Sequence, residues 1–137
     1  MKRNKVTGKE YDVVDSFNYA IDGIFEAIRT ERHMKFHSFI TVVAIMIAVF
    51  TDISREEILV LAISIALVWV AELFNSAVEA VVDLVTDKYH PLAKKAKDIA
   101  AGATLVTGIN ALIVGYIIFE DKIEFYLKNN FLAVKNS

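Results

Sequence analysis

The sequence predicts an all-α integral membrane protein with a surface helix near its N-terminus and three transmembrane helices. Hydrophobic residues make up 55% of the 137 residues and gather in long runs, and the mean hydropathy is +0.45. No segment alternates apolar and polar residues as a half-buried strand does. One proline and five glycines leave little room for long loops, so residues 1–137 are expected to form a single domain.

The segment from about residue 11 to residue 30 is predicted to form an amphipathic helix that lies on the membrane surface. Its apolar residues recur at helical spacing and therefore share one face. These residues are Val14, Phe17, Ile21, Ile24, Phe25 and Ile28. A helix packed on other protein helices would show the same pattern, but the neighbouring apolar segments favour the interfacial position.

The first predicted transmembrane helix covers about residues 34–51. This apolar run is short, because about 20 helical residues are needed to cross the hydrocarbon core. Its polar ends are therefore expected to extend toward the two interfaces. In the short loop that follows, Ser54 and Glu57 have the spacing of a capping box, which predicts the start of the next helix.

The second and third transmembrane helices are predicted at about 57–85 and 96–119. Residues 99–119 contain no charged side chain, which makes this the clearest span. Pro91 stands where a helix can begin, because proline is tolerated in the first turn. The tail, residues 120–137, spaces its apolar residues as a further interfacial helix would.

Lysine and arginine are distributed unevenly among the connecting segments. The N-terminal region and residues 88–97 hold most of those near the spans, whereas the 51–57 loop holds one arginine. Segments rich in these residues stay in the cytoplasm. We therefore expect a multi-pass protein whose N-terminus and 88–97 segment are cytoplasmic.

Four polar residues interrupt the apolar character of the second span: Glu72, Asn75, Glu79 and Asp83. At about 100° per residue they fall within a stripe of roughly 80°. A charge near the bilayer centre costs at least about 2.5–3.5 kcal/mol, so this stripe must face protein, water or a metal. The same end of the span is followed by four lysines between residues 88 and 97.

Two interpretations of this stripe remain open from the residues alone. Carboxylates that can hold Mg²⁺, together with lysines that neutralise phosphate, suit phosphoryl transfer at the cytoplasmic interface. Polar side chains satisfied at helix contacts would give the same pattern without any activity. Neither a P-loop nor a GxGxxG motif is present to decide for a nucleotide enzyme.

The segments "AELFNSAVEAVVDLV" and "YHPLAKKAKDIAAGA" resemble the prokaryotic diacylglycerol kinase family. Upstream, "SFNYAIDGIFEAIRTERHMKFH" is similar to that family's surface helix and first span, and more so to the Gram-positive branch of undecaprenol kinases. The resemblance covers about residues 12–119. It implies a bacterial cell-membrane homotrimer with active sites between protomers at the cytoplasmic face, and no nucleic-acid partner.

The resemblance further implies transfer of the ATP γ-phosphoryl group to a lipid hydroxyl, with Mg²⁺ as cofactor. Glu72 matches the general base, and Glu31 and Glu79 match the metal-holding pair. The positions that match ATP contacts are Tyr19, Glu31, Asn75, Glu79, Asp83, Lys88, Tyr89, His90, Lys97 and Asp98. Lipid contacts are expected from Phe17, Ala20, Ile24, Ile28, Val49, Val68, Trp69 and Glu72.

Several of these assignments have a plain structural alternative. Asp98 is expected to hold either Lys97 or the nucleotide, and Asn75 either a phosphate or Glu72. Glu31 would otherwise be a solvated partner of Arg32 or Lys35, and Asp83 an ion-pair partner of the 88–97 lysines. Lys94 and Lys95 are more simply anchors at the cytoplasmic interface.

Two positions depart from the family pattern. Asp12 stands where some members have a nucleotide-contacting arginine, so that contact is in doubt; Arg3, Lys5 or Lys9 are the candidates to replace it. His37 stands where other members have an acid, a change shared with the Gram-positive branch.

The predicted function is therefore a lipid kinase acting on undecaprenol, with diacylglycerol as the alternative substrate. A small proton-coupled transporter that uses Glu72 as its proton carrier is a more distant alternative. A scaffold subunit, whose polar stripe only joins helices, is another.

Overall fold

The computed structural model describes residues 12–135, without the side chains at 126–127 and 129–135. This part of the chain consists of four helices and no strand, which confirms the all-helical prediction. The helices are α1 (Val13–Thr30), α2 (Arg32–Phe50), α3 (Arg55–Val85) and α4 (Pro91–Lys135). Arg3, Lys5 and Lys9, the candidates to replace the arginine absent at Asp12, lie outside the described residues.

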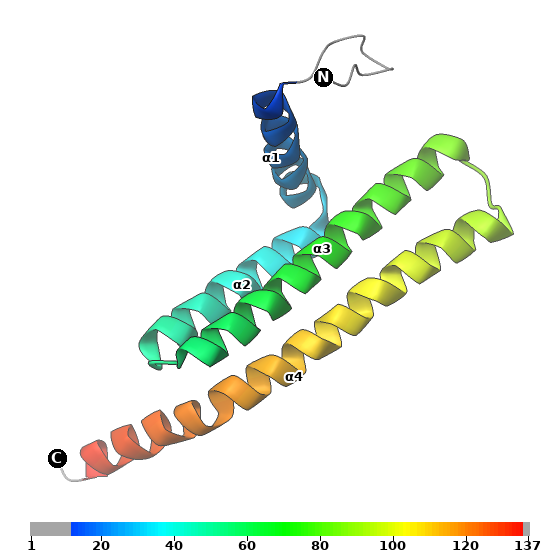
Figure 1. Cartoon of the computed structure of the whole chain (residues 1–137). Helices are drawn as coiled ribbons and strands as arrows, with labels where there is room; N and C mark the ends of the chain where they lie inside the picture. Colours follow the sequence, from blue (N-terminus) through cyan, green and yellow to red (C-terminus); the bar gives the residue numbers. More distant parts are fainter. Residues whose placement is uncertain (1–11, 136–137) are drawn as a thin grey trace.

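Helix α1 begins in a capping box and ends at a single-residue joint. The Asp12 carboxylate accepts from the Val13 N–H at 2.6 Å, and the Asp15 carboxylate accepts from the Asp12 N–H at 3.5 Å. At the other end, Glu31 has extended backbone angles and serves both as C-cap of α1 and as N-cap of α2. Because of this joint, α1 points away from the other three helices, which lie alongside one another (Figure 1).

Three helices, α2, α3 and the Pro91–Phe125 part of α4, are long and apolar enough to cross a membrane. The loop between α2 and α3 turns through Asp52, whose φ of 52° lies in the left-handed region that aspartate tolerates. The predicted capping box is confirmed, because Ser54 N–H donates to Glu57 Oε2 at 2.7 Å and Glu57 N–H donates to Ser54 Oγ at 3.2 Å. Helix α3 then packs most extensively against α4.

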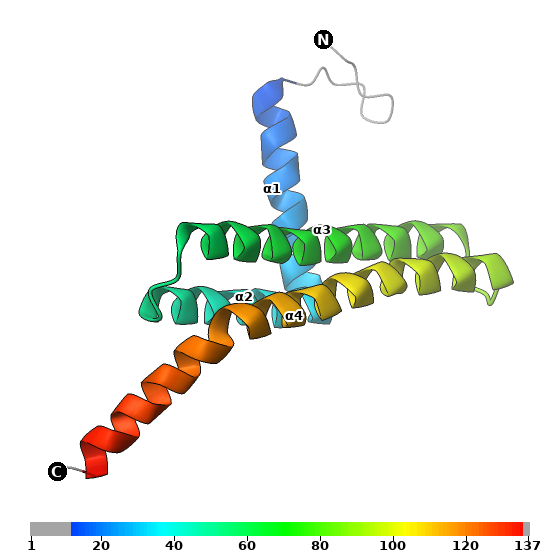
Figure 2. The same ribbon diagram turned by 60° about the horizontal axis from the view of Figure 1, so that its bottom comes forward.

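Helix α4 begins at Pro91, as its position in the sequence predicts, and continues without interruption to Lys135. The tail therefore extends α4 and does not form the separate helix that its spacing suggested. Between Phe119 and Lys135 the sequence has no proline or glycine to end the helix. Figure 2 shows that α4 changes direction in its orange segment, so its last part leaves the side of α3.

The buried core of one chain is small. Leu61, Ile118 and Phe119 form its apolar cluster, next to an ion pair of 3.2 Å between Lys122 Nζ and Glu57 Oε1. Most large apolar side chains of the described residues are exposed, including Phe39, Leu105 and Leu112. Apolar surface of this extent is typical of a protein covered by lipid or by other subunits.

Candidate active site

Three polar residues of α3 are buried: Ser64 in its first half, and Glu72 and Asn75 in its second half. Glu72 is 4% exposed and Asn75 is 8% exposed. Asn75 Nδ2 donates to Glu79 Oε1 at 2.9 Å, one turn along the helix. The structure thus joins Asn75 to Glu79, whereas the sequence suggested that Asn75 would contact Glu72 or a phosphate.

Glu72 is held from the neighbouring helix α2. Its Oε1 lies 3.1 Å from His37 Nε2, and the two side chains are 5% and 21% exposed, respectively. A carboxylate in an apolar setting needs such a partner, because an unpaired charge there is costly. Glu72 was predicted from the sequence as a site residue. His37 was noted there only as a departure from the family pattern.

Asn75 has an acceptor that the described residues do not satisfy. Its Oδ1 is buried and has no hydrogen-bond partner in that part of the chain. Buried polar atoms are normally paired, and leaving one unpaired costs about 1–3 kcal/mol. An incoming hydrogen-bond donor next to Glu79 would satisfy this atom.

Charged pairs lie where α3 ends and α4 begins. Lys97 Nζ lies 2.6 Å from Asp83 Oδ1. Asp83 therefore forms an ion pair with one of the 88–97 lysines, which was the alternative to its expected contact with ATP. Asp98 pairs with Lys94, one turn earlier on α4, and not with Lys97. All four side chains are more than a third exposed, so they are accessible to a soluble ligand.

Glu31 lies on a cavity between α1 and α3. This cavity measures about 460 Å³, and Tyr19, Ala20 and Glu31 line it from the α1 side, with Leu73 and Ser76 opposite. The Glu31 side chain makes no capping hydrogen bond, and among the described residues it has no ion pair with Arg32 or Lys35. Its carboxylate is therefore available for a ligand.

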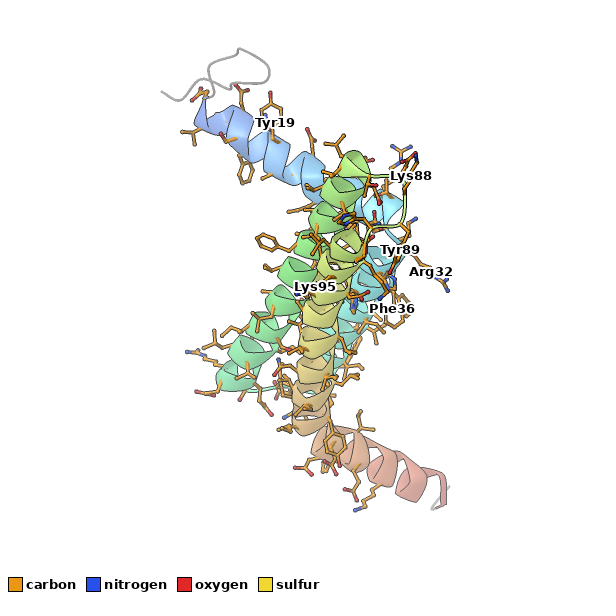
Figure 3. The ribbon with its side chains drawn as sticks, turned by 90° about the vertical axis from the view of Figure 1, so that its right-hand side faces the viewer. Tyr19, Arg32, Phe36, Lys88, Tyr89 and Lys95 are labelled. Carbon is orange, nitrogen blue, oxygen red and sulfur yellow. The ribbon has the colours of Figure 1, made fainter. Side chains whose placement is uncertain are left out.

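The connection between α3 and α4 is exposed. Thr86 Oγ1 closes a turn by accepting from the Lys88 N–H at 3.1 Å, and His90 Nδ1 accepts from the Leu92 N–H at 3.2 Å. His90 thus supports the start of α4, while Tyr89 is 81% exposed. In Figure 3, Lys88 and Tyr89 lie at the same end of the bundle as Arg32.

Comparison with known proteins shows the family to which the chain belongs. The family described as prokaryotic diacylglycerol kinase matches residues 18–119. The chain belongs to this family. The undecaprenol kinase of Bacillus subtilis (strain 168) is 41% identical to it over 108 residues, which are 79% of this chain and 88% of that protein.

Two diacylglycerol kinases are also similar to this family member. The enzyme of Synechocystis is 46% identical over 101 residues, which are 73% of this chain but only 58% of that longer protein. The enzyme of Escherichia coli (strain K12) is 31% identical over 106 residues, which are 77% of this chain and 87% of that protein. The chain is thus a membrane lipid kinase with ATP as phosphoryl donor, and the transporter and scaffold alternatives are set aside.

An apolar groove lies on the α3 face that carries Trp69 and Leu73, and Glu72 is not part of its lining. It measures about 820 Å³ and lies mainly between α2 and α3. Of the expected lipid contacts, Ile24, Val49 and Trp69 line this groove, and Ala20 lines the cavity at Glu31. Val68 lines a separate cavity of about 270 Å³ between α2, α3 and α4.

Phe17, Ile28 and Glu72, the remaining expected lipid contacts, line none of these cavities. Phe17 is exposed on α1, and Ile28 is half-buried.

Sequence reasoning missed the α2 partners of this region. Thr41 Oγ1 accepts from Trp69 Nε1 at 3.0 Å, one turn beyond the His37–Glu72 contact. The only available signal was that His37 and Thr41 are polar residues in an apolar run, four positions apart and thus on one face of α2.

Proposed function

We propose that this kinase phosphorylates undecaprenol to undecaprenyl phosphate at the cytoplasmic face of a bacterial cell membrane. The observation that carries the proposal is the 41% identity to an undecaprenol kinase along most of both proteins. A buried acid, Glu72, and an apolar groove between α2 and α3 support it. Diacylglycerol is the second candidate, because a diacylglycerol kinase is 46% identical to the matched part of the chain.

Glu72 is the general base in this proposal. It accepts the proton of the lipid hydroxyl while the hydroxyl oxygen forms a bond to the γ-phosphorus of ATP and the bond from that phosphorus to the β-phosphate oxygen breaks. The products are the lipid phosphate, ADP and a proton held on Glu72. Burial supports this role, since it keeps bulk water away from the reacting hydroxyl.

Glu31 and Glu79 would hold Mg²⁺, which when bound neutralises phosphate charge during transfer. The donor set fits: Glu31 has a carboxylate without a capping bond, and Glu79 is fixed by Asn75. Among the described residues no three His, Asp or Glu side chains cluster as a closed metal site. Two carboxylates leave coordination positions for phosphate oxygens, which is the usual mode for Mg²⁺ at nucleotides.

Lys97 would bind the ATP phosphates after exchanging its ion pair with Asp83 for phosphate oxygens. Both side chains are exposed enough to rearrange. Tyr19, Asp83, Asp98 and the 88–90 segment would surround the remainder of the nucleotide. The positive charges of the 88–97 segment support a cytoplasmic position for this end of the bundle.

The active enzyme is proposed to be a homotrimer with sites between protomers and with α1 on the membrane surface. The small core of the single chain supports subunit association. Asn110 supports it too, because its side chain is exposed in the middle of α4 and reaches only a 3.5 Å contact with Ser64. An amide at that depth is more stable against another subunit than against lipid.

The test uses purified full-length protein in mixed micelles with MgATP, and offers undecaprenol and diacylglycerol separately. Lipid phosphate is counted for the wild type and for Glu72→Gln. Faster phosphorylation of undecaprenol, lost in the variant, supports the proposal in full. A preference for diacylglycerol keeps the mechanism and overturns the substrate, whereas an active Glu72→Gln variant overturns the role of the base.

A further inference from the structure

The contact between His37 and Glu72 differs from the other ion pairs of the described residues by its burial. In the other four pairs both side chains are at least 24% exposed, whereas Glu72 is 5% and His37 is 21% exposed. No other described side chain forms an ion pair with Glu72. The orientation of the Glu72 carboxylate therefore depends on one residue of a different helix.

We propose that His37 is a positioning residue for phosphoryl transfer. Its Nε2 lies 3.1 Å from Glu72 Oε1. This contact holds the carboxylate so that its second oxygen faces the lipid hydroxyl and accepts its proton. This inference rests on the proposed role of Glu72 as the base.

The contact joins the imidazole to one oxygen of the Glu72 carboxylate and leaves the other oxygen without an ion-pair partner among the described side chains. The imidazole ring is itself restrained, because it packs edge-on against Phe36 with ring centroids 5.5 Å apart and an interplanar angle of 74°. Phe36 lies on the outer side of α2 in Figure 3.

Restraint of the base matters because glutamate has several rotatable bonds and proton transfer requires hydrogen-bond distance. A misplacement of about 1 Å can lower a rate on the order of 100-fold. His37 supplies the restraint from α2, across the interface with α3, and does not itself reach the reacting atoms in this proposal.

A purely structural link between α2 and α3 is the competing explanation. The chain offers a matched control, because the Trp69–Thr41 hydrogen bond joins the same two helices at 3.0 Å, one turn away. Thr41→Val removes that acceptor with little change in side-chain shape. Loss of either link weakens the α2–α3 interface, but only loss of His37 frees Glu72.

The experiment compares wild type, His37→Leu, His37→Gln, Thr41→Val, Glu72→Gln and the His37→Leu/Glu72→Gln double variant in mixed micelles at saturating lipid. His37→Leu is expected to lower kcat about 10- to 100-fold while KM for MgATP stays unchanged. His37→Gln retains a side-chain donor and is expected to recover most of kcat. Thr41→Val is expected to keep kcat within about twofold although it lowers the melting temperature as His37→Leu does.

The double variant completes the test. Once Glu72 is replaced, His37→Leu is expected to cause no further loss, since a positioning residue acts only through the group that it holds. Equal kcat losses in His37→Leu and Thr41→Val would overturn the proposal and leave Glu72 as the base. The same follows from a folded His37→Gln variant with no recovery, which also covers the case in which His37→Leu does not fold. An active Glu72→Gln variant would instead overturn the proposed role of Glu72 as the base, and phosphorylation of neither lipid by the wild type would overturn the proposed function.

Discussion

The two ends of α3 use the same residue types for different purposes. At its N-terminal end, Glu57 closes the capping box with Ser54 and pairs with Lys122. At its C-terminal half, Glu72 and Asn75 are buried, and Asn75 Oδ1 has no partner among the described residues. Glu57 is paired on both sides and supports the fold, whereas the buried, unsatisfied Asn75 Oδ1 next to Glu72 agrees with the ligand site proposed for this half of α3.

The largest difference between the two ends of α3 is expected when an acid at each end is neutralised. Glu72→Gln is expected to lower kcat by about 10²- to 10⁴-fold, because the amide cannot accept the hydroxyl proton. Glu57→Gln, at the other end, is expected to keep kcat near the wild-type value. Lipid phosphorylation assays of both variants measure this, and equal losses would show that the two ends do not differ in function.

The variant Glu79→Gln tests the proposed role of this acid in binding Mg²⁺. Loss of this carboxylate is expected to raise the Mg²⁺ concentration needed for half-maximal activity by about 10- to 100-fold, as for other weakened metal sites. Titration of activity with Mg²⁺ at fixed ATP measures the shift. Glu56→Gln, an exposed acid in the first turn of α3, is the control, and a similar shift there would contradict a specific role for Glu79.

The variants Lys97→Met and Lys95→Met test which of the two lysines binds the ATP phosphates. Lys97→Met is expected to raise KM for MgATP about tenfold, because it removes one positive charge from the phosphates and leaves Asp83 unpaired. Lys95, which forms no ion pair among the described side chains, is expected to tolerate the same change. A KM for MgATP that stays at the wild-type value in both variants would contradict a role for Lys97 at the phosphates and leave both lysines as interfacial anchors.

The smallest effect is expected at the capping end. Ser54→Ala removes the acceptor for the Glu57 N–H and is expected to lower the stability of the folded state by about 1 kcal/mol. Thermal unfolding in micelles measures the loss, and kcat is expected to stay at the wild-type value below the unfolding transition. A large loss of kcat there would mean that this end contributes to the reaction.

Apolar runs and capping residues were sufficient to predict the positions of the helices. Helix α3 begins next to Ser54, and α4 begins at Pro91, both from signals present in the sequence. The continuation of α4 through the tail was not predicted, because the spacing of apolar residues indicates a helix but not whether it is separate from the preceding one.

The candidate site was predictable along one helix and not between helices. Periodicity placed Glu72, Asn75, Glu79 and Asp83 on one side of α3. It did not predict the pairing of Glu72 with His37 or of Asp98 with Lys94. The Glu72–His37 pairing depends on how α2 is rotated and shifted against α3, which the pattern of one helix does not contain. The Asp98–Lys94 pairing depends on which of several nearby lysines the acid contacts, and the pattern does not decide this either.

The joint at Glu31 has a mechanical consequence. One residue in extended conformation separates two rigid helices of 18 and 19 residues. Any tilt of α1 relative to α2 must therefore be absorbed by the φ and ψ angles of Glu31 or its immediate neighbours. Since those angles also set the direction of the Glu31 carboxylate, a change in the tilt of α1 turns that acid relative to α2.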